Sequence, residues 1–168
     1  MSPPTDQPAL AAWFRRHADS ATRSFLVCRH EDGAIVGVFT LSQIVRRSFQ
    51  SAYMGYYAQE PFEGQGYMAE AMELVLRHAF IRMKLHRLEA NIQPENVASI
   101  ALVKRSGFRL EGFSPRYLKI AGRWRDHQRW AILIDDWRLL RRRPAAPSRC
   151  RVRRSRRGYS SPDRRHSG

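Results

Sequence analysis

Two glycines stand where an extended run of the chain gives way to a long amphipathic run. Gly64 and Gly66 follow the strand-like segment 52–58 and precede the helix-like segment 67–84. Glycine lets backbone N–H groups approach an anion closely, and a helix behind the turn adds the positive end of its dipole. The spacing therefore predicts a phosphate-binding turn, although a strand–glycine–helix turn can equally be purely structural.

A second motif opens the helix-like segment 95–106, which ends at a glycine. Asn96 is a good helix N-cap, and Ser99 is either a small helix residue or a hydroxyl available for chemistry. Together the two motifs resemble the GCN5-related N-acetyltransferase (GNAT) family, whose members move an acetyl group from acetyl-coenzyme A to an amine. The likeness spans about 25–137, includes the run 122–127, and is greatest for the branch that acetylates the N-terminal residue of ribosomal proteins.

The resemblance implies where coenzyme A would bind. Its pantetheine arm would run along the strand edge at Tyr57, Ala58 and Gln59, like an added strand. Asn96 would contact this arm, and Ser99 would lie close to the sulfur, where its hydroxyl could protonate the departing thiolate. A backbone N–H near Tyr57 would bind the thioester oxygen, so Ser99 and Tyr57 are the catalytic candidates. The backbone N–H groups expected to bind the pyrophosphate are those of Gly64, Gln65, Gly66, Tyr67 and Met68.

Three positions depart from the family's pattern. Pro61 stands where the family usually has Arg or Gln, so one donor is lost. Asn91 replaces a Glu of some relatives and Val103 a Tyr, so neither a strong base nor a tyrosyl acid is expected there. We therefore expect water-mediated deprotonation, which suits an α-amine with a pKa of about 7.8 better than a lysine near 10.4. Three nearby carboxylates are expected to be surface charges: Glu60, Glu63 and Glu89.

Other reactive side chains have simpler interpretations. The run 124–127, Trp-Arg-Asp-His, could supply an acid–base pair, but an aromatic anchor with a structural Asp–His contact is the simpler expectation. The remaining histidines lack the spacing of metal ligands, and two cysteines suggest neither a disulfide framework nor a metal cluster. We expect Cys28 to be a buried thiol, Cys150 to lie in a C-terminal tail, and no metal to be required.

Hydrophobic periodicity predicts the elements that position these residues. A glycine in each of the turns Asp32-Gly33 and Ala121-Gly122 indicates a hairpin. The pattern predicts a mixed α/β (α+β) domain with a mostly antiparallel central sheet flanked by helices. Family members begin with a further strand and helix, which we expect to be missing here. Strands are expected over 25–29, 34–41, 52–58, 87–92, 108–120 and 124–134, and helices over 8–20, 67–84 and 95–106.

Most of the formal charge of +15 lies at the C-terminal end of the 168-residue chain. Residues 138–168 hold 12 Arg and a single acid, Asp163, so we expect a disordered basic tail. Such a tail attracts RNA by counterion release, or it merely aids solubility. The expected organisation is an N-terminal segment over 1–24, an acetyl-CoA-binding domain over 25–137, and the tail.

Three functions are open from the sequence. The first is acetyl transfer from acetyl-CoA to the N-terminal α-amine of a ribosomal or other protein, by direct attack in a ternary complex. The second is acetylation of a small amine, such as an antibiotic, a polyamine or an amino acid, and the third is a truncated, non-catalytic, RNA-associated basic protein. No apolar run approaches the roughly 18 residues of a membrane span, so we expect a cytoplasmic monomer or homodimer that avoids membranes.

Overall fold

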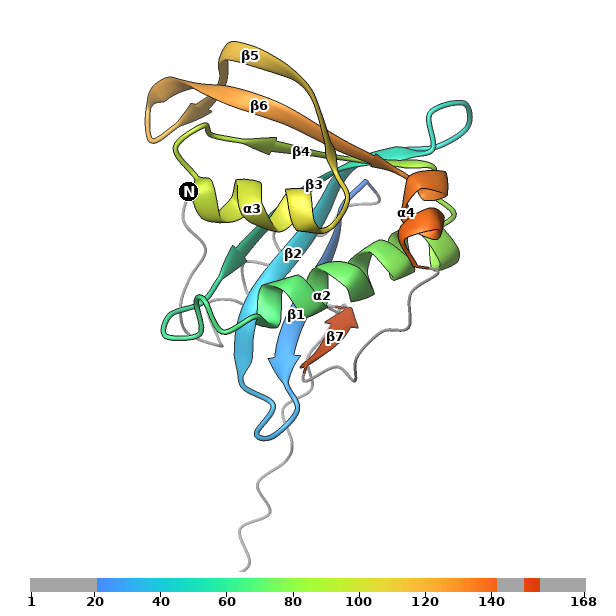
Figure 1. Cartoon of the computed structure of the whole chain (residues 1–168), viewed down its shortest axis with the longest axis vertical. Helices are drawn as coiled ribbons and strands as arrows, with labels where there is room; N and C mark the ends of the chain where they lie inside the picture. Colours follow the sequence, from blue (N-terminus) through green and yellow to red (C-terminus); the bar gives the residue numbers. More distant parts are fainter. Residues whose placement is uncertain (1–20, 142–149, 155–168) are drawn as a thin grey trace, which may run out of the picture.

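The computed structural model describes residues 21–141 and 150–154 (Figure 1). In this part of the chain, seven strands form one sheet in the order β5-β6-β4-β3-β2-β1-β7, and only β3 and β4 pair in parallel. This confirms the predicted mixed, mostly antiparallel sheet, while the helix predicted over 8–20 lies outside the described residues. The strands are β1 Arg23–Arg29, β2 Ile35–Val45, β3 Ser51–Ala58, β4 Arg87–Ile92, β5 Arg109–Ile120, β6 Arg123–Leu133 and β7 Cys150–Arg154. The helices are α2 Tyr67–Arg77, the π-helical turn η1 His78–Arg82, α3 Val97–Arg105 and α4 Ile134–Leu140.

The hairpin turn between β1 and β2 forms as predicted. Gly33 has a φ of 74°, a left-handed conformation that glycine adopts without strain. The carboxylate of Asp32 accepts the backbone N–H of Ala34 at 3.0 Å and also binds the Arg29 guanidinium. The positive Arg29 side chain and this N–H together hold the pKa of the Asp32 carboxyl well below its ordinary value. The turn therefore sets the register of the first hairpin.

Helix α2 buries the apolar stripe that the sequence predicts. Ala71, Met72, Val75 and Leu76 are completely buried in the core. The predicted single helix over 67–84 is wrong in its second half, because α2 ends at Arg77 and a π-helical turn follows. In that turn the N–H of residue 83 reaches the carbonyl of residue 78 at 3.0 Å. One wide turn hardly alters a hydrophobic stripe, so periodicity alone does not reveal it.

Strands β3 and β4 diverge partway along their length. Their parallel pairing runs from Ser51↔Arg87 to Tyr53↔Glu89 and then stops, although both strands continue. Beyond Tyr53, β3 keeps its pairing with β2, so only the edge toward β4 is open. Helices α2 and α3 lie on the same side of the sheet (Figure 1). The divergence leaves β3 with an open edge, and α3 is tied to this strand by the Tyr56 hydroxyl, which donates to the Ser99 carbonyl.

The expectation of disorder from residue 138 onward is wrong for two segments. Helix α4 continues to Leu140, with Trp137 buried against Phe80 at 5.4 Å between ring centroids. Strand β7 pairs with β1 along its whole length, and its Cys150 is 1% exposed. In the run Cys-Arg-Val-Arg-Arg, alternate residues suit a half-buried strand. The prediction of disorder was based on the net charge of residues 138–168 and did not take this alternation into account.

Candidate active site

The glycine turn has the geometry expected of an anion site. Gly64 and Gly66 have φ values of 72° and 87°, and Gly66 is the N-cap of α2. Its carbonyl accepts the N–H groups of Ala69 and Glu70, which begins the helix, and the first N–H groups of any helix have no acceptor within it. Residues 63–66 are exposed to solvent, so an anion can reach the positive end of α2.

Pro61 contributes to this turn in a way that the sequence did not reveal. Its carbonyl oxygen accepts a hydrogen bond from the side-chain amide of Gln65 at 3.0 Å. The position supplies no side-chain donor to a ligand, but it closes the loop that carries Gly64. Pro61 therefore lacks a side-chain donor for a ligand, as the sequence predicted, and in addition it has a structural role in the loop.

The register of β3 decides which backbone groups face the opening. Gln59 donates its N–H to the carbonyl of Val36 on β2 at 3.0 Å, whereas the Gln50 carbonyl accepts from His86 on the β4 side at 2.6 Å. Because backbone groups alternate sides along a strand, even-numbered residues of β3 direct their N–H and C=O toward the opening. Tyr57 is paired with Val38 and directs its own toward β2.

The backbone N–H of Tyr57, predicted as the oxyanion donor, faces β2, so the residues on either side of it are the ones that can donate into the opening. Tyr56 and Ala58 present their backbone groups to the open edge, while those of Tyr57 and Gln59 point away from it. Of the three positions predicted along the pantetheine arm, only Ala58 has its main chain on the correct side. Because backbone groups alternate with a period of two, a difference of one residue turns an N–H group from one neighbouring strand to the other. The sequence does not show which residues of the two strands are paired.

Helix α3 brings Asn96 and Ser99 to this edge. The Asn96 side-chain oxygen accepts the Ser99 backbone N–H at 3.0 Å, so the N-cap role is confirmed. The Tyr56 hydroxyl donates to the Ser99 carbonyl at 3.3 Å and ties α3 to β3. The Ser99 side chain is partly exposed and lies within reach of the Tyr56 hydroxyl, so its own hydroxyl can turn from that residue to a ligand. The structure thus places Ser99, the predicted acid, next to the open edge of β3.

The two tyrosines at this edge predict a stability change at high pH. Burial raises the pKa values of Tyr56 and Tyr57 to about 12, above the ordinary 10.0. Their ionised forms are disfavoured in the folded protein, so this contribution is complete below pH 10 and is lost as the pH rises toward about 12. We expect the melting temperature to fall across this window, and to fall less steeply in a Tyr56→Phe/Tyr57→Phe variant. Equal slopes for the two proteins would contradict the assignment.

The opposite face of the divergent strands is polar. The carbonyl oxygen of the Asn91 side chain and the Tyr57 hydroxyl are buried and have no hydrogen-bond partner. Gly55, two residues before Tyr57 on β3, is exposed, and a Cβ built there meets nothing within 4 Å. The Glu89 carboxylate on this face is neutralised by Arg87, whose Nε lies 3.0 Å away. Unsatisfied buried polar atoms are rare, and each of these two oxygens is able to accept an N–H group.

Several spare groups are excluded from this site. Glu60 and Glu63 are exposed in the loop, as expected, and Val103 is completely buried. The predicted Asp–His contact is wrong: Asp126 accepts the backbone N–H of residue 116 at 2.7 Å, whereas His127 is buried with Nδ1 3.0 Å from the carbonyl of residue 125. Adjacent strand residues point to opposite faces, which separates the two side chains. Over residues 21–141 and 150–154, no cluster of His, Cys, Asp and Glu is arranged to hold a metal.

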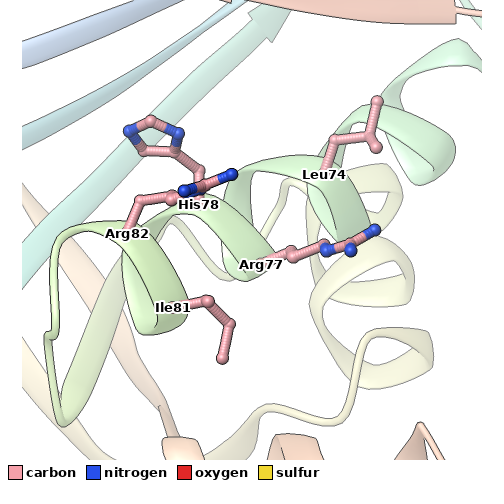
Figure 2. A pocket seen from close by; sticks show the side chains of 5 residues that line it. All are labelled: Leu74, Arg77, His78, Ile81 and Arg82. Carbon is pink, nitrogen blue, oxygen red and sulfur yellow. The ribbon is translucent and has the colours of Figure 1, made fainter.

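Two surface pockets lie elsewhere. One is lined by α2 and η1 residues, which Figure 2 shows as Leu74, Arg77, His78, Ile81 and Arg82. A second lies beside β7 and includes Phe25 and Cys150. Neither contains a residue predicted for catalysis or for coenzyme A binding, and both border the C-terminal half of α2, away from the glycine turn.

Residues 1–109 match the family model of the acetyltransferase (GNAT) domain. The chain belongs to the GNAT family. It is 41% identical to a probable N-acetyltransferase of Bacillus subtilis, YjcK, over 105 residues, which are 62% of this chain and 58% of that protein. It is 38% identical to the ribosomal protein uS5-alanine N-acetyltransferase of Escherichia coli over 107 residues, 64% of this chain and 55% of that enzyme.

Solved structures of GNAT proteins share this fold. RimJ of Mycobacterium smegmatis, in complex with CoA-disulfide, superposes with a TM-score of 0.66 and 34% identity, over 75% of this chain and 58% of that one. The ribosomal-protein-S5-alanine acetyltransferase of Vibrio fischeri superposes with a TM-score of 0.67 and 26% identity, over 81% and 79% of the two chains. The chain thus spans little more than half the length of the two curated relatives. These comparisons confirm the predicted family and fold.

Proposed function

We propose that this GNAT domain transfers the acetyl group of acetyl-CoA to the N-terminal α-amine of a ribosomal or other protein, in a ternary complex. The observation that carries the proposal is the opening between β3 and β4, which separates two different surfaces. On one side lie the glycine turn and Ser99 of α3. On the other lie the unpartnered oxygens of Asn91 and Tyr57. A thioester held on the first side faces an amine held on the second.

The residues around the opening have complementary roles in this reaction. The amine nitrogen bonds to the thioester carbon as the carbon–sulfur bond breaks, and the amine proton passes to water. The backbone N–H of Tyr56 or Ala58 stabilises the negative charge that develops on the carbonyl oxygen. The Ser99 hydroxyl gives a proton to the departing thiolate and regains one from solvent. Family resemblance supports acetyl-CoA as the donor, and so does the CoA-disulfide bound by the RimJ relative.

The charges on the acceptor face favour an α-amine over a polycation. The side chains of Asn91 and Tyr57 present neutral oxygen atoms. The Tyr57 hydroxyl stays protonated because burial raises its pKa to about 12. The Glu89 carboxylate is already paired with Arg87, which also binds Glu111. A buried neutral acceptor stabilises an N–H group without stabilising a full positive charge. An α-amine, with a pKa of about 7.8, supplies a neutral form readily at neutral pH.

Turnover assays with three acceptor panels test this proposal. The protein is mixed with acetyl-CoA and a thiol-reactive dye, and receives peptides that start with Ala or Ser, lysine peptides with blocked N-termini, or polyamines and antibiotics. We expect thiol release with the first panel alone. Turnover with small amines only would reject the α-amine acceptor, and silence in all panels would reject the enzymatic role. Calorimetry with coenzyme A then shows whether donor binding survives.

Asn91 gives a prediction in which stability and activity change in opposite directions. We expect Asn91→Leu to raise the melting temperature, because it removes a buried unsatisfied oxygen that costs about 1–3 kcal/mol. The same change should lower kcat/KM for the peptide by roughly three- to tenfold, the value of one neutral hydrogen bond. The affinity for coenzyme A should be unchanged in calorimetry.

Asn91→Asp is the matched control for this site. It keeps the shape of the side chain but adds a negative charge, which should shift preference toward cationic amines. If Asn91→Leu lost stability and kept full activity, Asn91 would be a structural residue without a role in acceptor binding.

A further inference from the structure

The hairpin of β5 and β6 extends beyond the rest of the sheet. Strand β6 pairs with β4 only as far as Ile92↔Gln128, whereas its pairing with β5 continues to Ile120↔Arg123. The segment 114–127 is therefore a two-stranded arm at the sheet's edge, visible in Figure 1 where β5 and β6 pass the end of β4. The base of the arm is packed, because His127 is buried and its ring lies 6.1 Å from that of Tyr117, whereas residues 118–126 are exposed and available for contacts with another molecule.

The arm is strongly basic. Its four cationic side chains are exposed, and none of the ion pairs among the described residues involves them. Its one acid, Asp126, is occupied by the backbone N–H at residue 116, at 2.7 Å. Asp126 thus forms no ion pair with a cation, and four cations less one acid leave the arm with a net charge of +3. The four cations are Arg116, Lys119, Arg123 and Arg125.

Exposed apolar side chains alternate with these cations. Trp124 is 60% exposed, and Leu118 and Ile120 are 41% and 37% exposed. The register places Trp124 beside Lys119 on one face, and Leu118 beside Arg125 on the other. Each face of the arm thus combines a cation with an apolar surface. Such exposure of large apolar side chains on a sheet edge usually marks an interaction site.

We propose that the arm binds single-stranded RNA, with Trp124 stacked on a base and Lys119, which the register places beside it on the same face, on a phosphate. A second copy of the chain is a poor partner, because its arm would bring the same four cations against these. An acidic peptide would neutralise the charge but offers no planar surface to the exposed indole. Stacking on an aromatic side chain tolerates any base, and cations along a ribbon follow a phosphate backbone. The inference does not rest on the proposed acetyl transfer.

Binding of a fluorescently labelled ten-nucleotide RNA of mixed sequence, followed by anisotropy over a range of salt, tests this arm in the full chain. We expect Trp124→Ala to weaken binding by about five- to 150-fold at fixed salt. Lys119→Gln should reduce the salt slope by about 0.7, the contribution of one phosphate contact on a single strand. Arg77→Gln removes one exposed cation far from the arm and is the matched control.

The control separates the arm from the rest of the basic chain. All variants keep the arginines of residues 142–168, so any RNA affinity of those residues is common to each measurement. Equal binding by wild type, Trp124→Ala and Lys119→Gln would overturn the proposal, as would no RNA binding at all. A ten-glutamate peptide that bound more tightly than the RNA, and lost affinity with the arm variants, would replace RNA by an acidic protein partner.

Discussion

Gly66→Val is expected to abolish measurable acetyl transfer and to weaken coenzyme A binding by about a hundredfold, because each hydrogen bond to a charged group that is lost contributes about 1.5–3 kcal/mol. Gly66 has a φ of 87° at the N-cap of α2, where a β-branched residue is strained. Its new side chain would also occupy the space through which an anion approaches the helix N-terminus. Calorimetry with coenzyme A and the thiol-release assay measure both effects.

A second glycine provides the control for backbone strain. Gly122 has a φ of 79° in the β5–β6 turn, and a Cβ there meets nothing within 4 Å. Gly122→Val therefore introduces similar strain at a distance from the phosphate site. We expect it to lower the melting temperature while retaining affinity for coenzyme A. Wild-type turnover by Gly66→Val would show that the glycine turn is not the phosphate site.

Ser99→Ala is expected to lower kcat by about 10²- to 10⁴-fold, the usual contribution of a positioned general acid. The substitution keeps the backbone N–H that Asn96 caps and the carbonyl that Tyr56 binds. Helix α3 should therefore stay in place, and the loss should fall on kcat and not on the affinity for coenzyme A. Steady-state kinetics at saturating peptide and calorimetry together separate these quantities.

Ser99→Thr tests whether the hydroxyl itself is responsible. It retains an O–H group at the same position on α3, and we expect it to recover part of the activity that alanine loses. Turnover by Ser99→Ala within threefold of wild type would mean that water protonates the thiolate. Loss of coenzyme A affinity in Ser99→Ala would instead indicate a purely structural contribution to the pantetheine site.

The elements that were predicted best from the sequence are those in which apolar residues recur with a regular period. The stripe that includes Ala71, Met72 and Val75 predicted α2, and the alternation around Leu88 predicted β4. The turn at Gly33 and the end of α3 near Gly107 followed from local backbone preferences. Each of these signals depends on neighbours within a few residues, so a single sequence contains all the information needed.

Helix α4 and strand β7, which extend into the region predicted to be disordered, depend on partners that are distant in the sequence. Strand β7 forms because β1 offers it an open edge, and Cys150 then reaches the core, where its thiol contacts the Tyr67 carbonyl at 3.7 Å. Helix α4 forms because Trp137 packs on Phe80. Neither partner is close in sequence. The abundance of arginine near these segments suggested disorder, and tertiary packing overrode that composition.

The candidate site divides in the same way. The sequence by itself determined the glycine turn, the Asn96 cap and the serine one turn later, because family motifs and helix-end chemistry are local. Only the tertiary structure decided that Tyr56 and Ala58, and not Tyr57, face the opening, and that Asn91 has an unsatisfied oxygen on the other side. The reason is that strand register and burial arise from pairing between segments far apart in the chain, and no local pattern specifies them.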